Sequence, residues 1–179
     1  MYISAYAALW FLPFVLPICL WVAWSDLRDM KIPNNAVMAL VAIYLVIGLI
    51  ALPLDIYAWR WVHLVVVLLA GIALNAIGAL GAGDAKFAAA AAPFVAIGDL
   101  KLVLLILAAT MFFGYIIHRI AKHTALRRLA PHWVSWTREG KYPMGLSLGG
   151  ALAIYLVQGA LAGTEPSAAM TPIGGLILP

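Results

Sequence analysis

Residues 61–86 read WVHLVVVLLAGIALNAIGALGAGDAK. From Trp61 to Gly83 the stretch contains no Asp, Glu, Lys or Arg, and it then reaches Asp84 and Lys86. A helix needs about 20 mostly apolar residues to cross the hydrocarbon core of a bilayer. The stretch therefore predicts a membrane-spanning helix with acidic and basic side chains at one end.

The composition of the whole chain agrees with this interpretation. Of its 179 residues, 66% are hydrophobic and only 10% are charged, whereas soluble domains are about half apolar and about one-quarter charged. This excludes a water-soluble fold, and we expect a single membrane-embedded domain over residues 1–179. Uncharged runs recur along the chain at residues 1–25, 32–54, 61–83, 87–98, 102–118 and 142–164.

The basic residues between these runs predict the number and direction of the spans. Cytoplasmic loops of membrane proteins are enriched in Lys and Arg. If the short run 87–98 counts as a span, an outside N-terminus leaves only Arg60 and Lys101 of the 11 Lys and Arg residues outside. We therefore predict an all-α polytopic bundle of six transmembrane helices with the N-terminus outside. On this topology the outer segments also contain Asp55, Trp59, Trp61, Asp99 and Glu165.

The net charge of +4 follows from this orientation, so we expect no nucleic-acid partner. The segment from Arg119 to Leu129 mixes basic and apolar residues, a pattern typical of a helix that lies on a membrane surface. It predicts attraction of the 119–141 loop to anionic lipids, with a solvated loop as the alternative. The tail 166–179 is apolar but interrupted by proline and glycine, and it carries no prediction.

Acidic side chains are scarce, and this topology leaves only four of them on the cytoplasmic side: Asp26, Asp29, Asp84 and Glu139. Asp26 and Asp84 directly follow long apolar runs, so we expect them at the cytoplasmic ends of the first and third spans, where ionisable groups are often functional. Two carboxyls that face each other would share a proton. The ionised one activates water while the protonated one donates to a peptide carbonyl, which is the chemistry of an aspartic protease. Taken alone, either residue could simply mark the membrane boundary.

A glycine pair precedes the second of these carboxyls. In the stretch GAGD, residues 81–84, Gly81 and Gly83 remove side chains next to Asp84. Glycine permits unusual backbone angles and close approach of a substrate. The motif is too short to be specific by itself, but its position at a predicted helix junction supports a functional interpretation.

A second motif surrounds the first carboxyl. Residues 26–34 read DLRDMKIPN. The stretch ends one predicted span at Asp26, turns through Pro33 and opens the next span at Asn34. Both motifs therefore lie at cytoplasmic junctions between predicted helices.

Together the two motifs resemble the signatures of the type IV prepilin peptidase family, whose Gly-x-Gly-Asp motif is shared with presenilin-like intramembrane proteases. The resemblance extends from Asp26 to the end of the fourth predicted span, and the stretch YPMG at residues 142–145 is similar to a Pro-x-Gly element that opens the last helix. It implies an aspartyl endopeptidase in which Asp26 and Asp84 are the catalytic pair. The residues that it implies as substrate-site or backbone support are Gly81, Gly83, Lys86, Pro33 and Asn34.

The resemblance also implies a substrate and a location. A member of this family removes the leader peptide of type IV prepilins at the cytoplasmic face of a bacterial inner membrane, and the substrate has a short basic leader followed by a hydrophobic helix. Long members carry a methyltransferase portion with paired Cys-x-x-Cys motifs, whereas this chain has a single cysteine, Cys19. It therefore resembles the short peptidases of tight-adherence (Flp) pilus systems, and we expect no methyltransferase domain, no metal and no other cofactor.

Two alternatives concern the identity of the reactive residues. Asp29 is the alternative to Asp26, because residues three apart share one face if the helix continues. The stretch GLSLG around Ser147 matches the Gly-x-Ser-x-Gly pattern of serine hydrolases, with His63 or His118 as a base. In a helix, however, this spacing of glycines is more typical of close packing.

The alternatives from other classes are a small transporter and a non-catalytic assembly protein of a secretion machine. Carboxylates of transporters usually lie near the middle of the bilayer. In the predicted topology every Asp and Glu lies at a membrane edge, which favours a site for substrates that enter at the interface.

Overall fold

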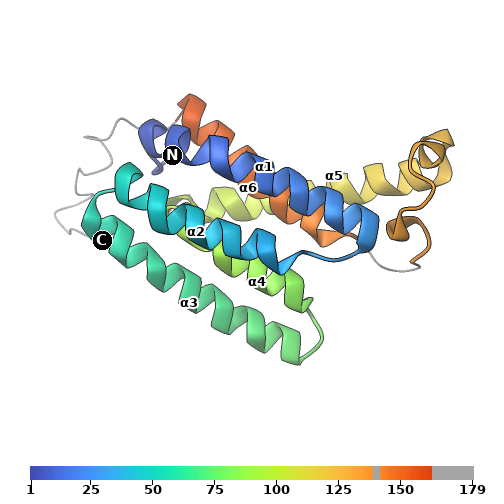
Figure 1. The fold of residues 1–179 in the computed structure, drawn as a ribbon, viewed down its shortest axis with the longest axis horizontal. Helices are drawn as coiled ribbons and strands as arrows, with labels where there is room; N and C mark the ends of the chain where they lie inside the picture. Colours follow the sequence, from blue (N-terminus) through green and yellow to red (C-terminus); the bar gives the residue numbers. More distant parts are fainter. Residues whose placement is uncertain (139–141, 163–179) are drawn as a thin grey trace.

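The computed structural model describes residues 1–138 and 142–162 as a bundle of helices (Figure 1). Neither described range contains a strand, so the predicted all-α class is confirmed. The α-helices are α1 (Ala5–Asp29), α2 (Asn34–Ala51), α3 (Leu54–Ala76), α4 (Ala82–Ala91), α5 (Leu100–His123) and α6 (Met144–Ala162). Short 3-10 turns, η1 (Ala92–Phe94), η2 (Ile97–Asp99), η3 (Ala125–Leu129) and η4 (Val134–Trp136), lie in the connections.

Five of these helices are long and apolar enough to cross a membrane: α1, α2, α3, α5 with the turn before it, and α6. The run 87–98, predicted as a sixth spanning helix, is not one continuous helix: it is divided between α4 and the turns η1 and η2. α4 begins before that run, at Ala82, and has only 10 residues. At 1.5 Å per residue it covers about half of a hydrocarbon core of roughly 30 Å. Pro93 has no backbone N–H with which to continue an α-helix, and the chain passes through η1 and η2 instead.

The boundaries of α3 also differ from the prediction. α3 begins directly after Pro53, so Trp59, Arg60 and Trp61 belong to the helix and not to an outer loop. It ends at Ala76, several residues before the uncharged run does. The reason is a turn in which Gly78 has φ 74°, a conformation that residues with a side chain rarely adopt.

The structure describes only part of the chain after α5. α5 continues to His123 and is followed by the 3-10 turn η3, so the predicted surface helix 119–129 is helical in two separate pieces. The predictions for Glu139, Lys141, Glu165 and the tail 166–179 lie outside the described residues.

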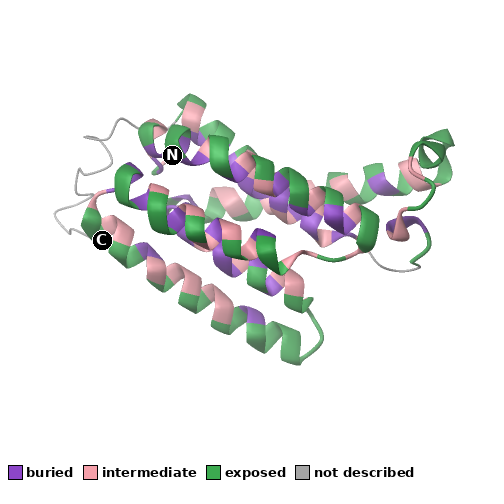
Figure 2. Cartoon of the chain, in the orientation of Figure 1, coloured by how far each residue is buried: buried purple, intermediate pink, exposed green. Residues whose placement is uncertain are grey.

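The buried side chains lie mainly between α1, α2, α4 and α6 (Figure 2). α1 and α6 form the most extensive pair of helices, and glycines of α6 allow this approach. A Cβ atom added at Gly149 would lie 2.8 Å from the backbone oxygen of Cys19, and one at Gly159 would lie 3.1 Å from the Cβ of Ala8. Small residues permit the same close contact in other membrane helix pairs. α3 packs chiefly on α4 and α5 chiefly on α6, so these two helices flank the core.

A buried carboxylate attaches the N-terminus to the bundle. Asp99 is only 4% exposed, although the sequence placed it in an outer segment. It accepts hydrogen bonds of 2.9 Å from the backbone N–H groups of Tyr2 and Ile3 and from the hydroxyl of Tyr155. The carboxylate therefore joins the first residues of the chain to α6 through the break between α4 and α5.

A buried cation stabilises the same break. Arg60, also expected outside, is 6% exposed, and its Nη1 lies 3.4 Å from the carbonyl oxygen of Pro93 and 3.5 Å from that of Phe94. Irregular backbone inside a membrane protein needs such internal partners, because lipid offers none. The two charged side chains thus explain how α4 can end inside the bundle.

We expect Asp99→Ala to destabilise the protein, because it leaves buried N–H and O–H donors without an acceptor. The cost of such unsatisfied groups is about 1–3 kcal/mol. Thermal unfolding of the detergent-solubilised protein measures this loss. Asp55→Ala is the matched control, since Asp55 is an exposed carboxylate in the first turn of α3. Equal melting temperatures for the two variants would show that the Asp99 contacts contribute nothing to stability.

Candidate active site

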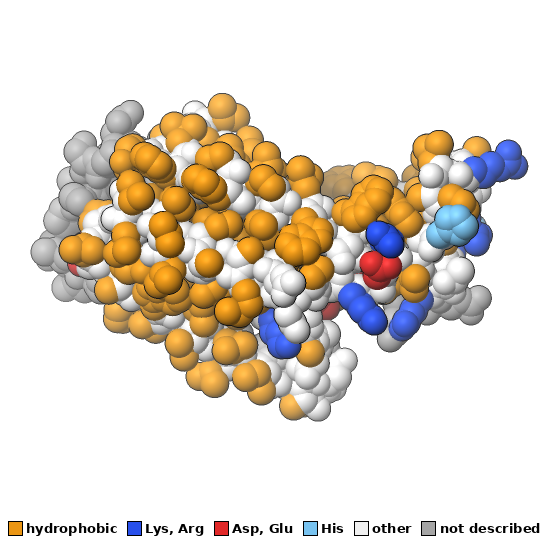
Figure 3. Space-filling view, viewed as in Figure 1, with side chains coloured by type: hydrophobic (Ala, Val, Ile, Leu, Met, Phe, Trp, Pro, Cys, Tyr) orange, Lys and Arg blue, Asp and Glu red, His pale blue; other side chains and the backbone are white. Residues whose placement is uncertain are grey.

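Charged side chains gather toward one end of the bundle, whereas hydrophobic side chains cover most of the remaining surface on the face shown in Figure 3. This end is formed by the connection between α1 and α2 and by the last turns of α5 (Figure 1). Both sequence motifs lie here, because α1 ends and α4 begins at this end of the bundle.

Asp26 lies in the last turn of α1 and is 5% exposed. Its Oδ2 accepts a hydrogen bond of 2.6 Å from the backbone N–H of Gly145, in the first turn of α6. A Cβ atom at Gly145 would lie 2.9 Å from the Cβ of Asp26 and 3.0 Å from its Oδ2. Only a glycine at this position therefore allows the amide to approach the carboxylate so closely.

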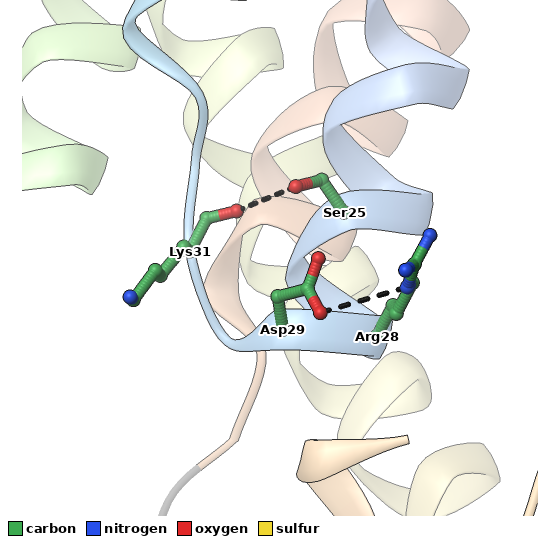
Figure 4. A network of polar contacts seen from close by, with 4 residues as sticks. All are labelled: Ser25, Arg28, Asp29 and Lys31. Atoms are coloured by element: carbon green, nitrogen blue, oxygen red, sulfur yellow. Dashed lines mark hydrogen bonds and ion pairs between the residues drawn. The ribbon is translucent and has the colours of Figure 1, made fainter. Parts of the chain in front are cut away.

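Asp29, the alternative to Asp26, has a different environment. Its side chain is 51% exposed and forms an ion pair with Arg28, with 3.6 Å between Nε and Oδ1 (Figure 4). Beside it, the hydroxyl of Ser25 donates to the backbone oxygen of Lys31 at 2.9 Å and fixes the turn that leaves α1. Of the two carboxylates, the buried one is therefore Asp26 and the solvated one is Asp29.

Asp84 lies in the first turn of α4 and is half-buried. The sequence placed it at the end of the third span, but the structure assigns it to the start of the next helix. Burial, together with the negative charge of nearby Asp26, raises the pKa of Asp84 to about 6. The structure thus brings Asp26 and Asp84 close enough for one carboxylate to influence the ionisation of the other.

The two glycines before Asp84 differ in their surroundings. A Cβ atom on Gly81 would lie 2.5 Å from Oδ2 of Asp84, whereas one on Gly83 would find its nearest neighbour, Ile32, at 3.5 Å. The second distance is an ordinary van der Waals contact. It is therefore Gly81, at the N-cap of α4, that leaves room for the carboxylate.

The remaining residues implied by the resemblance connect the two motifs. Pro33 is the N-cap of α2 and Asn34 is its first residue. The ammonium group of Lys86 donates to Oδ1 of Asn34 at 3.3 Å. Lys86 and Asn34 are both exposed, and their contact joins the start of α2 to the first turns of α4.

The predicted alternative with a serine nucleophile does not form. The hydroxyl of Ser147 donates to the carbonyl oxygen of Thr110 at 3.0 Å and lies 2.7 Å from the hydroxyl of Tyr142. None of the hydrogen bonds among the described residues joins Ser147 to His63 or His118. The described part of the chain also contains no group of three His, Cys, Asp or Glu residues that could hold a metal ion.

Sequence reasoning assigned Gly145 a role in helix packing but none in the active site. The Pro-x-Gly element at residues 142–145 was the available signal, because it is similar to an element of the family. The contact to Asp26 is separated by 119 residues in sequence, and a pattern within one segment carries no information on such a contact. Gly145 is therefore a site residue that the fold reveals.

These features define a helical membrane protein with two interacting carboxyls at one end of its bundle. The chain matches the type IV leader peptidase family over residues 13–118, which is more than half of its length, and it belongs to this family. It is accordingly a multi-pass membrane protein and a peptidase of the type IV leader class. No curated protein and no solved structure matches the chain.

We expect Gly145→Ala to reduce peptidase activity by at least about tenfold, because the added methyl group would push the buried carboxylate away from its amide donor; displacing a catalytic group by 1 Å can cost about 100-fold. Initial rates of leader cleavage measure the effect. The matched control is Gly150→Ala on the same helix, where the nearest atom to an added Cβ is 3.9 Å away. Full activity of Gly145→Ala would contradict the role given to the amide.

We also expect the carboxyl proton of Asp84 to titrate near pH 6 in the substrate-free protein. A raised pKa means that the group keeps its proton below this pH and loses it above. Asp26→Asn removes the neighbouring negative charge, so the titration of Asp84 should move to lower pH. The carbonyl stretch of a protonated carboxyl, followed by infrared difference spectroscopy, measures it. A titration of Asp84 that is identical in both proteins would show that the two carboxyls do not interact.

Proposed function

We propose that the chain is an aspartyl endopeptidase that removes the leader peptide of type IV, Flp-like prepilins at the cytoplasmic face of the bacterial inner membrane. The observation that carries this proposal is that Asp26, at the end of α1, and Asp84, at the start of α4, lie near enough for the charge of Asp26 to raise the pKa of Asp84. Membership of the type IV leader peptidase family supports it.

The two carboxyls differ in a way that suits separate roles. Asp26 accepts a short hydrogen bond from the Gly145 amide, and such a bond stabilises an ionised carboxylate. None of the hydrogen bonds among the described residues ends on the carboxylate of Asp84, and its raised pKa favours its protonated form. We therefore assign Asp26 as the general base and Asp84 as the general acid.

The reaction follows from these assignments. Asp26 removes a proton from water as the water oxygen bonds to the scissile carbonyl carbon, and Asp84 gives its proton to the carbonyl oxygen. When the C–N bond breaks, the proton on Asp26 passes to the leaving amine. Asp84 regains a proton from a hydroxyl of the intermediate, so both carboxyls return to their starting states and no other co-reactant than water is consumed.

The remaining site residues position these groups. Gly81 leaves space for the carboxylate of Asp84, and the bond between Lys86 and Asn34 fixes α4 against the start of α2. Pro33 sets the direction in which α2 leaves the turn, because its ring fixes φ near −65°. In this proposal Gly83 adds backbone that a substrate can approach closely.

The basic segment after α5 supports the proposed orientation. Its side chains from Arg127 to Leu129 are all exposed, and Leu126 and Leu129 expose apolar surface beside the arginines. Apolar and basic groups together favour an anionic membrane surface. We therefore propose that this segment contacts anionic lipid on the cytoplasmic side, with the N-terminus of the chain outside.

We expect Asp26→Asn and Asp84→Asn each to abolish leader cleavage, because an amide keeps the shape of the side chain but cannot exchange the proton. The double variant should be little worse than either single one, since the two residues act as a unit. Gel-shift assays of prepilin processing in membranes, with immunoblots for expression, measure this.

The control for this experiment is Asp29→Asn, which removes a solvated carboxylate of the same helix end and should retain most of the activity. Processing at the wild-type rate by a well-expressed Asp84→Asn variant would refute the aspartyl mechanism. Loss of activity in Asp29→Asn alone would transfer the base to that residue.

A further inference from the structure

An apolar groove opens between α3 and α5. It has a volume of about 470 Å³, and none of the residues that line it is Asp, Glu, Lys or Arg. α4 and α6 form its floor, because they lie between the two flanking helices and pack against them. The side chains on its walls are partly exposed, with Val66 of α3 at 57% and Leu104 of α5 at 55%. The groove is therefore open toward the lipid in which these helices are embedded.

The floor of this groove continues the helix face that carries Asp84. Residues four and seven positions apart share one face of an α-helix, and Ala88 and Ala91, at these distances from Asp84, line the groove. Their small side chains leave the backbone of α4 accessible for close packing, as small residues do in membrane helix pairs. The groove thus begins one turn after the carboxyl of Asp84 and extends away from the charged end of the bundle.

We propose that this groove binds the hydrophobic helix of the substrate, the segment that follows the bond to be cleaved. This inference rests on the proposed function and adds the place where the substrate is held. A helix that lies along α4, between α3 and α5, would have its end next to Asp84 and its apolar side chains against apolar walls. The scissile bond would then be positioned by the depth at which the helix packs, while the basic leader extends toward the charged end.

Continuity with the carboxyl distinguishes this occupant from a lipid chain or a second copy of the protein. A lipid chain or a second copy of the protein could bind in an apolar groove anywhere on the surface, whether or not the groove is continuous with the helix face that carries Asp84. The hydrophobic segment of a prepilin does require this continuity, because its first residue is joined to the peptide bond that the carboxyls must reach. The absence of charged side chains from the walls also fits an uncharged helix, since an unpaired charge in this position would be costly.

Two adjacent leucines of α5 provide the test. Leu104 lines the groove, whereas Leu105, which is 69% exposed, is not among its lining residues. Leu104→Trp should narrow the groove and raise KM for full-length prepilin on the order of tenfold with kcat little changed, which is the behaviour of lost substrate binding. Leu105→Trp, an equally large change on the same helix, should leave KM unchanged. Equal KM values in the two variants would overturn the proposal.

Crosslinking tests the same groove without catalysis. A photo-crosslinking amino acid in place of Leu104, in the Asp84→Asn background, should capture the hydrophobic segment of prepilin, and the same probe in place of Leu105 should not. Capture of lipid alone, of a second copy of the chain, or of the chain's own residues 163–179 would overturn the inference. The two proposals fail in different ways. If the groove does not bind the substrate, the crosslink from position 104 is lost. If Asp84 is not catalytic, the Asp84→Asn variant still cleaves prepilin.

Discussion

The hydrogen bond from the Gly145 amide to Asp26 depends on the close approach of α1 and α6, and much of the site depends on that bond. Gly145 and Gly149 lie on one face of α6, and at both positions a Cβ atom would collide with α1. Without side chains there, the helix backbones come near enough for a 2.6 Å contact. The orientation of the proposed base therefore depends directly on the packing of α1 against α6.

At the other end of the bundle, buried polar side chains stabilise the break between α4 and α5. α4 ends after 10 residues, so its last carbonyl groups and the two 3-10 turns after it need hydrogen-bond partners within the protein. Arg60 supplies donors, Tyr155 donates to Asp99 and accepts from the backbone of Ala96 at 3.1 Å, and Asp99 accepts from the N-terminal backbone. These buried polar groups allow a half-length helix to present Asp84 at one end of the bundle.

The sequence predicted the helical class, five of the spans and the two motifs, because uncharged runs and local glycine patterns are properties of single segments. It did not predict that the run 87–98 is divided between α4 and two 3-10 turns, since a run of apolar residues does not reveal where Pro93 interrupts the hydrogen bonding. It also did not predict that Arg60 and Asp99 are buried, because the internal hydrogen-bond partners of a charged side chain are not visible in its own segment. The contact between Gly145 and Asp26 could not be predicted, since it joins helices at opposite ends of the chain. The assignment of Asp26 and Asp84 as catalytic stays a prediction.

The pairing of the first helix with the last has a consequence for how the protein is made. During synthesis α1 enters the membrane when its main partner, α6, has not yet been translated, and contacts between residues far apart in sequence form late. Asp99, which binds the N-terminal backbone, is also made long after the residues that it holds. Until α6 has been made, the surface of α1 that faces Gly145 and Gly149 therefore lacks its partner, and the carboxyl of Asp26 lacks its amide donor. The order of translation keeps the proposed active site unassembled until α6 is inserted.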